Sequence, residues 1–155
     1  MPTYVAKTSI KQRPAPRISS AKVRAWGDKM LYKLALPDAE LSVVLCDDSY
    51  IWELNREHRG KDRPTDVLSF PQAEFSAPER PRQGESLQLL GDVVISLVTA
   101  QRQADSRRRS LESEVRFLLA HGVLHLVGHD HMNPHDKRIM TNRTRQLVRA
   151  APITE

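Results

Sequence analysis

Hydrophobic and polar residues alternate along this chain with two periods, and the longer period marks helices. From about Ile18 to Leu36, apolar side chains recur every three or four residues, as on one face of an amphipathic helix. Ser19 or Ser20 can cap the N-terminus of this helix, and Pro37 is expected to end it. The same reasoning predicts further helices over 49–58, 97–105, 111–127 and 135–149.

The helix predicted over 111–127 is the main one. Ser110 suits its N-cap position, and Glu112 and Glu114 are acidic residues in a first turn where the helix dipole is positive. Gly128 follows the last apolar position, where many helices end in a left-handed residue. We therefore expect the chain to reverse direction directly after this helix.

Short apolar runs mark the strands. Residues 41–46 are β-branched and continuously apolar, which is typical of a buried strand, and 67–71 and 92–97 are further strands. A short edge strand is expected near Tyr4–Val5. The proline-containing segment 72–90 is expected to be a long exposed loop, with room for a strand near Leu87–Leu90. Strands and helices mix without regular βαβ alternation, so we predict an α+β fold with a small mixed sheet of about four strands and about five helices.

Length and composition are those of a single globular domain, 1–155. Of the 155 residues, 39% are hydrophobic and 28% charged, which is enough to bury a core. No apolar run approaches the ~20 residues that a membrane-spanning helix needs, so no membrane partner is expected. Cys46 is the only cysteine, which excludes an internal disulfide, favours a reducing, cytoplasmic location and predicts a small buried hydrophobe.

Positive charge is concentrated in a few segments. The net charge is +5, and residues 1–27 contain basic residues but no acid. A run of arginines lies at 107–109, and a third group of basic residues lies within 137–149. Such clusters attract a polyanion such as RNA, although solvated charge that only aids solubility is an equal alternative. The segment 1–17 lacks the apolar core of a signal peptide and is expected to form a basic, flexible arm.

Histidines carry the most specific chemical pattern. Four of the six fall within 121–131, and three of them, His121, His125 and His131, have the spacing H-x-x-x-H-x-x-G-x-x-H. The first two are four residues apart on one helix and share a face, with Cβ atoms roughly 5–6 Å apart. The bend at Gly128 can return His131 to them. The pattern predicts a metal site at the end of the main helix, with one position left open as in catalytic zinc sites.

Two other histidines compete for the third ligand position. His129 directly follows the turn, and His135 lies beyond Pro134, so the spacing favours His131. Asp130 has two equal interpretations. It can accept a hydrogen bond from the far nitrogen of a ligand imidazole, or it can be a turn residue.

The residue after the first histidine limits the chemistry. Metalloproteases with the pattern H-E-x-x-H-x-x-G-x-x-H use its glutamate as the general base for zinc-bound water. Gly122 occupies that position here and has no side chain to accept a proton. Peptide hydrolysis by the usual route is therefore not expected.

Two long motifs give the chain a family resemblance. The segment "HGVLHLVGHDH", 121–131, resembles H-G-x-L-H-L-x-G-Y-D-H, the signature of the YbeY family of bacterial rRNA-maturation endoribonucleases. The segment "LNREHRGKDRPTDVLSFP", 54–71, resembles L-N-x-x-Y-R-x-K-D-x-P-T-D-V-L-S-F-P of the same family. A third block, "GDVVIS" at 91–96, also agrees, so that the resemblance covers about residues 40–132.

The resemblance implies a fold, a cofactor and an activity. It implies one α+β domain, one Zn²⁺ per chain held by His121, His125 and His131, and cleavage of single-stranded RNA. It also implies a role in ribosomal RNA processing, notably at the small-subunit 3′ end, and in ribosome quality control. The implied partners are ribosomal RNA and the ribosome, with no DNA expected.

The second motif supplies candidate residues for contacting RNA. Arg59 matches an arginine that the family is thought to need for activity, and its planar, permanently charged guanidinium suits a phosphate. Without the resemblance, a salt bridge from Arg59 to Asp62 or Asp66 would be the simpler interpretation. Asp66 itself is expected to bond backbone amides where the strand begins. Lys61 and Arg63 are candidates to extend a path for the RNA backbone, with solvated charge as an equal alternative.

Three functions follow as hypotheses. The first is a zinc-dependent, single-strand-specific endoribonuclease, in which either the RNA 2′-hydroxyl or zinc-bound water attacks phosphorus. The second is a non-catalytic ribosome assembly factor whose zinc shapes the fold, and the third is another zinc hydrolase. His58 and His129 each replace a tyrosine of the family pattern, and neither change removes an expected ligand.

Overall fold

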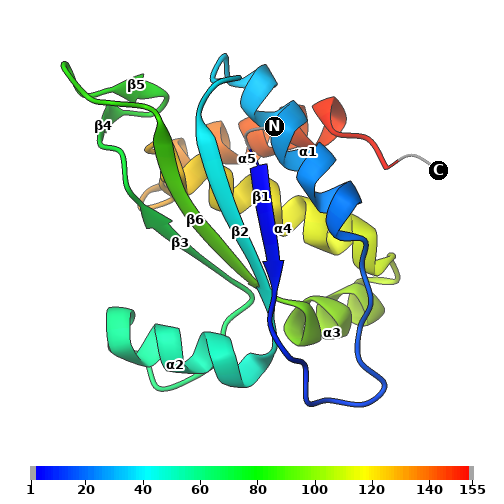
Figure 1. The fold of residues 1–155 in the computed structure, drawn as a ribbon. Helices are drawn as coiled ribbons and strands as arrows, with labels where there is room; N and C mark the ends of the chain where they lie inside the picture. Colours follow the sequence, from blue (N-terminus) through cyan, green and yellow to red (C-terminus); the bar gives the residue numbers. More distant parts are fainter. Residues whose placement is uncertain (1–2, 154–155) are drawn as a thin grey trace.

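The protein is built around a four-stranded mixed sheet in a computed structural model that describes residues 3–153 (Figure 1). In spatial order the strands are β1 (Thr3–Lys7), β2 (Glu40–Cys46), β6 (Leu89–Ser96) and β3 (Val67–Pro71). β1 and β6 run parallel to β2, whereas β3 runs antiparallel to β6. The expected edge strand near Tyr4–Val5 is confirmed as β1, so part of the basic segment 1–17 is built into the sheet.

The helices lie on both faces of this sheet. Within residues 3–153 they are α1 (Ser20–Lys33), α2 (Asp48–Arg59), α3 (Leu97–Arg107), α4 (Leu111–Leu126) and α5 (Pro134–Ala150). α1, α4 and α5 pack together over one face, while α2 covers part of the other (Figure 1). The predicted α+β fold is therefore confirmed. None of these helices combines the length and the apolar character that crossing a membrane requires.

Helix starts follow the capping residues of the sequence. Ser19, rather than Ser20, caps α1, and Asp47 caps α2. Ser110 caps α4 as predicted, and its side chain accepts a hydrogen bond from the backbone of the first turn. In each case the side-chain oxygen satisfies an N–H group that has no partner within the helix.

The end of α1 differs from the prediction. The helix stops at Lys33, before Leu36 and before the breaker Pro37. Ala35 adopts a left-handed backbone with φ 61°, and the N–H of Leu36 donates to the Leu31 carbonyl at 2.8 Å. A left-handed residue that folds the chain back onto the last turn ends a helix without any proline.

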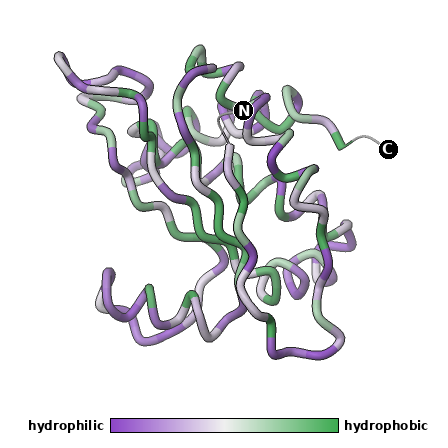
Figure 2. The backbone as a smooth tube through the Cα atoms, in the orientation of Figure 1, coloured by the Kyte–Doolittle hydropathy of each residue, from purple (hydrophilic) through white to green (hydrophobic). Residues whose placement is uncertain are grey.

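Two clusters of buried side chains hold the layers together. The larger joins α1, α4 and α5 to residues such as Leu41 and Ile95, and the smaller lies beneath α2 around Cys46 and Val94. The strands accordingly form the hydrophobic centre of the chain trace (Figure 2). The run 41–46 is a buried strand, as predicted, and Cys46 is a buried hydrophobe. Burial, followed by the nearby Asp47 and Asp48 carboxylates, raises the pKa of its thiol to about 12.

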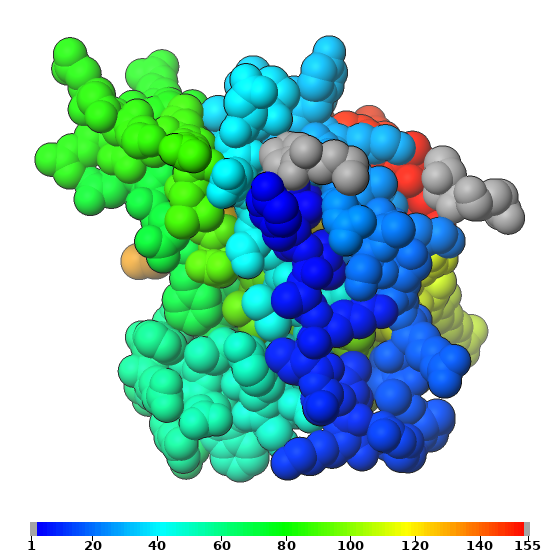
Figure 3. All heavy atoms as spheres, in the orientation of Figure 1, coloured from blue at the N-terminus to red at the C-terminus, as the bar shows by residue number. Residues whose placement is uncertain are grey.

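The segment 72–90 is more structured than the long exposed loop that its sequence predicts, and the strand expected near Leu87–Leu90 is the start of β6, which begins at Leu89. The segment contains a hairpin of two short strands, β4 (Phe75–Ala77) and β5 (Arg80–Pro81), in the region that projects at the upper left of the space-filling view (Figure 3). The Glu79 N–H donates to the Val127 carbonyl at 2.8 Å, which docks the hairpin turn on the end of α4. Strands of two or three residues are too short to show a hydrophobic period, so the pattern could not reveal them.

Candidate metal centre

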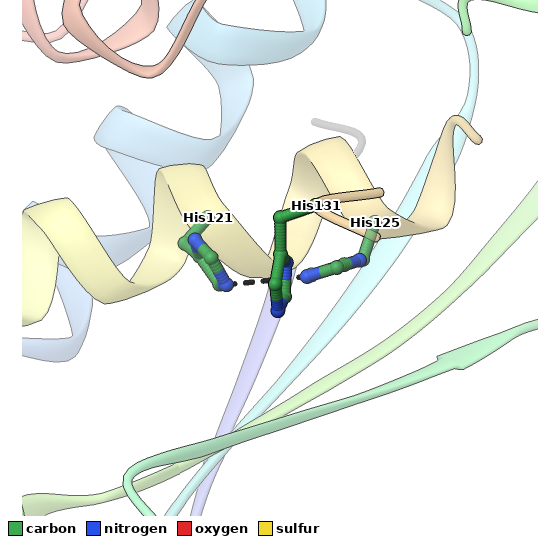
Figure 4. Close-up of side chains that lie close together, drawn as sticks. All are labelled: His121, His125 and His131. Carbon is green, nitrogen blue, oxygen red and sulfur yellow. Dashed lines mark hydrogen bonds between the residues drawn. The ribbon is translucent and has the colours of Figure 1, made fainter. Parts of the chain in front are cut away.

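Three imidazoles converge at the C-terminal end of α4 (Figure 4). His121 and His125 project from successive turns of the helix, and their Nε2 atoms lie 3.2 Å apart. His131 reaches the same point from the segment after the helix. One ring nitrogen from each residue lies within 4.8 Å of the other two, so the three predicted ligands do form a single group.

The geometry of this group suits zinc. Nitrogens bound at 2.0–2.1 Å to a tetrahedral zinc ion are about 3.3–3.4 Å apart. The His121 and His125 Nε2 atoms, at 3.2 Å, already have nearly this separation. Among residues 3–153 the group of possible ligands contains no fourth side chain, so an ion bound here would keep a coordination position for another molecule.

The electrostatic environment keeps these imidazoles ready to bind a cation. Burial, followed by the neighbouring His121 and His131, lowers the pKa of His125 to about 4. The pKa of His121 is also lowered, mainly by burial and to a smaller extent by His131, while the Asp66 carboxylate partly opposes this effect. Both rings are therefore neutral near pH 7, and a neutral imidazole has the free electron pair that a metal requires.

The bend that returns His131 depends on glycine. Gly128 has φ 95°, a backbone conformation that other residues rarely adopt. A Cβ atom at this position would lie 2.9 Å from the Phe75 Cβ and 3.1 Å from the Ala77 carbonyl oxygen. The predicted left-handed turn is confirmed, and the β4–β5 hairpin adds a second reason for glycine.

His129 takes part in a different interaction, one that holds the loop in place. Its buried ring places Nε2 2.8 Å from the Glu79 carboxylate, and Arg143 of α5 donates to both oxygens of that carboxylate at 2.9 Å. Burial raises the pKa of Glu79, but the hydrogen bonds from Arg143 and His129 outweigh it and hold the pKa below its usual value. His135 lies outside the group, so His131 is the third histidine, as the spacing predicts.

Asp130 behaves as a turn residue. Its Oδ1 accepts a hydrogen bond from the backbone N–H of His131 at 2.7 Å. Of the two interpretations that the sequence leaves open, the structure therefore supports the local one. The carboxylate still lies close enough to oppose the lowering of the His125 pKa.

The close approach of α4 to the sheet explains why Gly122 follows the first histidine. A Cβ on Gly122 would lie 2.6 Å from the Val93 Cγ1 and 3.3 Å from the Ser69 Oγ. The Ser69 hydroxyl donates to the Gly122 carbonyl at 2.9 Å. A glutamate here would have to enter the packed interface between helix and sheet, so this helix cannot carry the protease base at that position.

Residues of both sequence motifs line one cavity of about 790 Å³. Arg59, at the end of α2, donates from Nη2 to the Ser69 carbonyl at 3.0 Å, and it forms no salt bridge to Asp62 or Asp66. Asp66 accepts instead from the backbone N–H of Val67 at 2.8 Å, which is the structural role predicted for it. The cavity brings together every candidate site residue from the sequence: Arg59, Lys61, Arg63, His121, His125 and His131.

Three residues support this cavity in ways that the sequence does not show. Asn55, which is buried, donates from Nδ2 to the Arg63 carbonyl at 2.8 Å and shapes the loop after α2. Ser69 connects Arg59 to α4, and Glu79 anchors the loop that carries His131. Asn55 and Ser69 lie inside the second motif, whereas Glu79 lies in a proline-containing segment without any recognisable pattern.

Comparison with known proteins identifies relatives of this chain. A family model described as "Endoribonuclease YbeY" matches residues 8–151. A protein named Endoribonuclease YbeY from Desulforamulus reducens is 50% identical over 112 residues, covering 72% of this chain and 72% of the relative. One of the same name from Anaeromyxobacter sp. strain Fw109-5 is 45% identical over 139 residues, covering 90% of this chain and 68% of the relative.

A solved structure supports the fold. The solution structure of TM1509 from Thermotoga maritima has a TM-score of 0.64 to this chain at 24% sequence identity. The superposition covers 96% of this chain and 88% of that protein. At this level of identity the likeness concerns the fold alone.

Proposed function

This chain belongs to the Endoribonuclease YbeY family, and from that premise we propose that it is a zinc-dependent endoribonuclease that cleaves single-stranded RNA in ribosomal RNA processing. The observation that carries the proposal is that three convergent imidazoles and Arg59 line one and the same cavity. RNA supplies the phosphodiester that such a cavity can polarise. Small-subunit 3′-end maturation and ribosome quality control are the proposed settings, with ribosomal RNA and the ribosome as partners.

His121, His125 and His131 are the proposed zinc ligands. When bound, zinc supplies a Lewis acid for a phosphate oxygen or a water molecule of lowered pKa. His121 and His125 are neutral near pH 7, and their Nε2 atoms already have nearly the separation of two nitrogens bound to one zinc ion. They therefore need little rearrangement to bind an ion. The absence of a fourth protein ligand among residues 3–153 favours a catalytic site over a purely structural one.

Arg59 is the proposed phosphate-binding catalytic residue. Its bond to the Ser69 carbonyl uses one N–H group and orients the guanidinium toward the cavity. The remaining N–H groups can bind the oxygens of a phosphodiester and stabilise the negative charge that accumulates as phosphorus gains a fifth ligand. Because this stabilisation grows toward the transition state, it accelerates the reaction rather than only tightening binding.

The surrounding charges suit an extended RNA strand. Lys61 and Arg63 are cationic residues of the same cavity, and we propose that they contact the RNA backbone. Position 122, where a metalloprotease carries its glutamate base, is a glycine that packs on the sheet. The cavity therefore has no carboxylate at that position. We also propose a cytoplasmic location, where ribosomes and a reduced, buried Cys46 are both expected.

A charge reversal at Arg59 tests this function. Arg59→Glu should reduce zinc-dependent cleavage of an unstructured RNA by about 10²–10³-fold, the usual effect of removing a group that stabilises a transition-state oxyanion. Zinc content should stay at that of the wild type, because Arg59 is not a ligand. Cleavage is measured on gel-resolved fragments, with and without a chelator, and zinc by elemental analysis.

Arg56→Glu is the matched control. Arg56 is an exposed residue of the same helix that does not line the cavity, so its reversal changes the net charge equally. We expect cleavage near the wild-type rate. If Arg59→Glu and Arg56→Glu cut RNA equally fast, Arg59 has no catalytic role. Parallel purification of all variants controls for contaminating nucleases.

A further inference from the structure

A second cavity adjoins the metal centre. It has a volume of about 580 Å³, lies between α4 and α5, and shares His121 and His131 with the first cavity. Neither sequence motif predicts it, because most of its lining comes from α5, which lies outside both motifs. Its lining includes three apolar and three cationic side chains: Phe117, Met140, Val148, Arg109, Lys137 and Arg145.

Flat groups dominate one wall of this cavity. The half-buried Phe117 ring lies nearly parallel to the His121 ring, at 23°, with 6.4 Å between their centroids. The guanidinium carbon of Arg109 lies 5.6 Å from the Phe117 centroid. Arg109 is held there by an ion pair with the buried Glu114 at 3.1 Å. Aromatic rings and guanidinium planes are the surfaces on which unpaired nucleobases stack.

The α5 part of the lining supplies positive charge that the protein does not neutralise. Lys137 and Arg145 are eight residues apart on α5 and therefore lie on one side of that helix. Both are exposed, and neither forms a salt bridge within residues 3–153. An apolar, aromatic cavity with two free cations at its margin is complementary to a nucleotide, which combines a flat base with a negatively charged phosphate.

We propose that this second cavity binds one unpaired nucleobase of the RNA, adjacent to the phosphodiester at the metal centre. The base stacks against Phe117 and Arg109, while Lys137 and Arg145 contact neighbouring phosphates. The proposal rests on the proposed endoribonuclease function, because the shared residues His121 and His131 place the base beside the cleaved bond.

The pocket provides a physical basis for selecting single strands. A base in a duplex is stacked between its neighbours and paired, so it cannot enter the pocket without losing those interactions. The pocket also predicts weak base preference. The buried Thr144 hydroxyl donates to the Met140 carbonyl at 2.7 Å, so its proton is not free to read the edge of a base. Stacking is tolerant of sequence because every base offers an aromatic face.

Binding of an uncleavable RNA tests the pocket directly. The probe is fluorescein-labelled 2′-O-methyl hexaadenylate, titrated with the full-length, zinc-loaded protein by fluorescence anisotropy. Phe117→Leu keeps an apolar side chain but removes the aromatic face, and should weaken binding roughly tenfold. Phe117→Trp should bind as tightly as the wild type or more tightly. Lys137→Gln and Arg145→Gln should each weaken binding a few-fold and lower its salt dependence by about one phosphate contact.

Arg149→Gln is the matched control on α5. Arg149 is exposed and lies outside the second cavity, and its replacement removes the same charge. It should leave affinity near that of the wild type. Circular dichroism and thermal unfolding establish that each variant is folded. If Phe117→Leu does not fold, the test rests on the two cationic residues. Lys137→Gln and Arg145→Gln should then bind the probe more weakly than Arg149→Gln, and equal affinity in all three variants would contradict the proposal.

An abasic scan separates the pocket from general RNA affinity. Replacing each nucleotide of the probe in turn by an abasic one should identify one position where the wild type loses roughly tenfold in affinity and Phe117→Leu loses almost nothing further. Equal binding by Phe117→Leu and wild type, or an abasic effect that persists unchanged in the variant, would overturn the pocket. If the protein shows zinc-dependent cleavage but the abasic effect does not depend on Phe117, only the pocket proposal is refuted. If the abasic effect depends on Phe117 but the protein does not cleave RNA, the pocket is supported and the proposed endoribonuclease function is refuted.

Discussion

The two cavities that meet at His121 and His131 are lined by different kinds of side chain. The first is lined by groups held in place by hydrogen bonds: Arg59 is tied to Ser69, and Asn55 fixes the loop that carries Arg63. The second is lined by apolar side chains and by cations without ion-pair partners within residues 3–153, apart from Arg109.

This difference matches what each kind of interaction requires. A reacting phosphate needs charged groups placed within a fraction of an ångström, so their own positions have to be fixed beforehand. A stacked base needs area and a general positive potential, both of which tolerate movement. His125 lines only the first cavity, and Phe117 lines only the second, so substitutions can separate the two contributions.

The sharpest test of this division is His125→Ala. Loss of one of three ligands should reduce zinc content and lower RNA cleavage by more than about 100-fold, which is the upper range for removing a group that merely supports a ligand. Because His125 does not line the second cavity, affinity for the uncleavable hexaadenylate probe should change only a few-fold. Elemental analysis, cleavage assays and anisotropy measure the three quantities.

His135→Ala is the control for this substitution. His135 is exposed, lies at the start of α5 and is not part of the histidine group, so zinc content and cleavage should remain at wild-type levels. A folded His125→Ala protein that still cleaves RNA at the wild-type rate would show that the histidine group is not the catalytic centre. Equal losses of cleavage and binding would show that the two cavities act as one.

A smaller effect is expected from substituting Glu79, which holds the loop that carries His131. Glu79→Gln weakens the interactions with His129 and Arg143 that hold the loop carrying His131. Because this loop places a ligand that borders both cavities, zinc affinity should fall by roughly tenfold, with a parallel loss of cleavage. Competition with a metal chelator of known affinity measures the change.

Glu74→Gln tests whether this effect is specific. Glu74 is an exposed residue just before the same hairpin, and its carboxylate pairs with Arg82 rather than with the metal loop. Its substitution should leave zinc affinity unchanged. Equal zinc affinity in the Glu79 and Glu74 variants would contradict the anchoring role.

The mildest test uses pH on the zinc-free protein. The pKa of His125 is about 4 in the folded protein, whereas a histidine in the unfolded chain titrates near 6.5. Between these values the unfolded chain binds the proton and the folded chain does not. The free energy of unfolding is therefore at its full value above about pH 6.5 and decreases as the pH falls toward 4.

We expect the Tm of the zinc-free protein to fall by a few degrees between pH 7 and pH 5. His125→Ala, which lacks the titrating group, should show a smaller decrease, and differential scanning calorimetry compares the two. A Tm that does not change over this range, or that changes equally in both proteins, would contradict the assignment. The lysine and arginine side chains of the second cavity keep their charge between pH 7 and pH 5. The free energy of binding the hexaadenylate probe should therefore decrease by less than the free energy of unfolding does.

The local features of the protein could be predicted from the sequence. Helical spacing placed His121 and His125 on one face, and the turn at Gly128 returned His131, because these relations depend only on backbone geometry over eleven residues. The capping residues and the buried strand at 41–46 followed from equally local rules. The family resemblance added Arg59, which no periodicity would have selected.

What only the tertiary structure decided are the contacts between distant segments. The order β1-β2-β6-β3 places β3 beside α4, so that Ser69 can connect Arg59 to the helix that carries the histidines. The hairpin that holds Glu79 against His129, and the second cavity between α4 and α5, likewise arise where separate elements pack. A hydrophobic pattern reports which face of an element is buried, but not against which partner, because many arrangements bury the same area equally well.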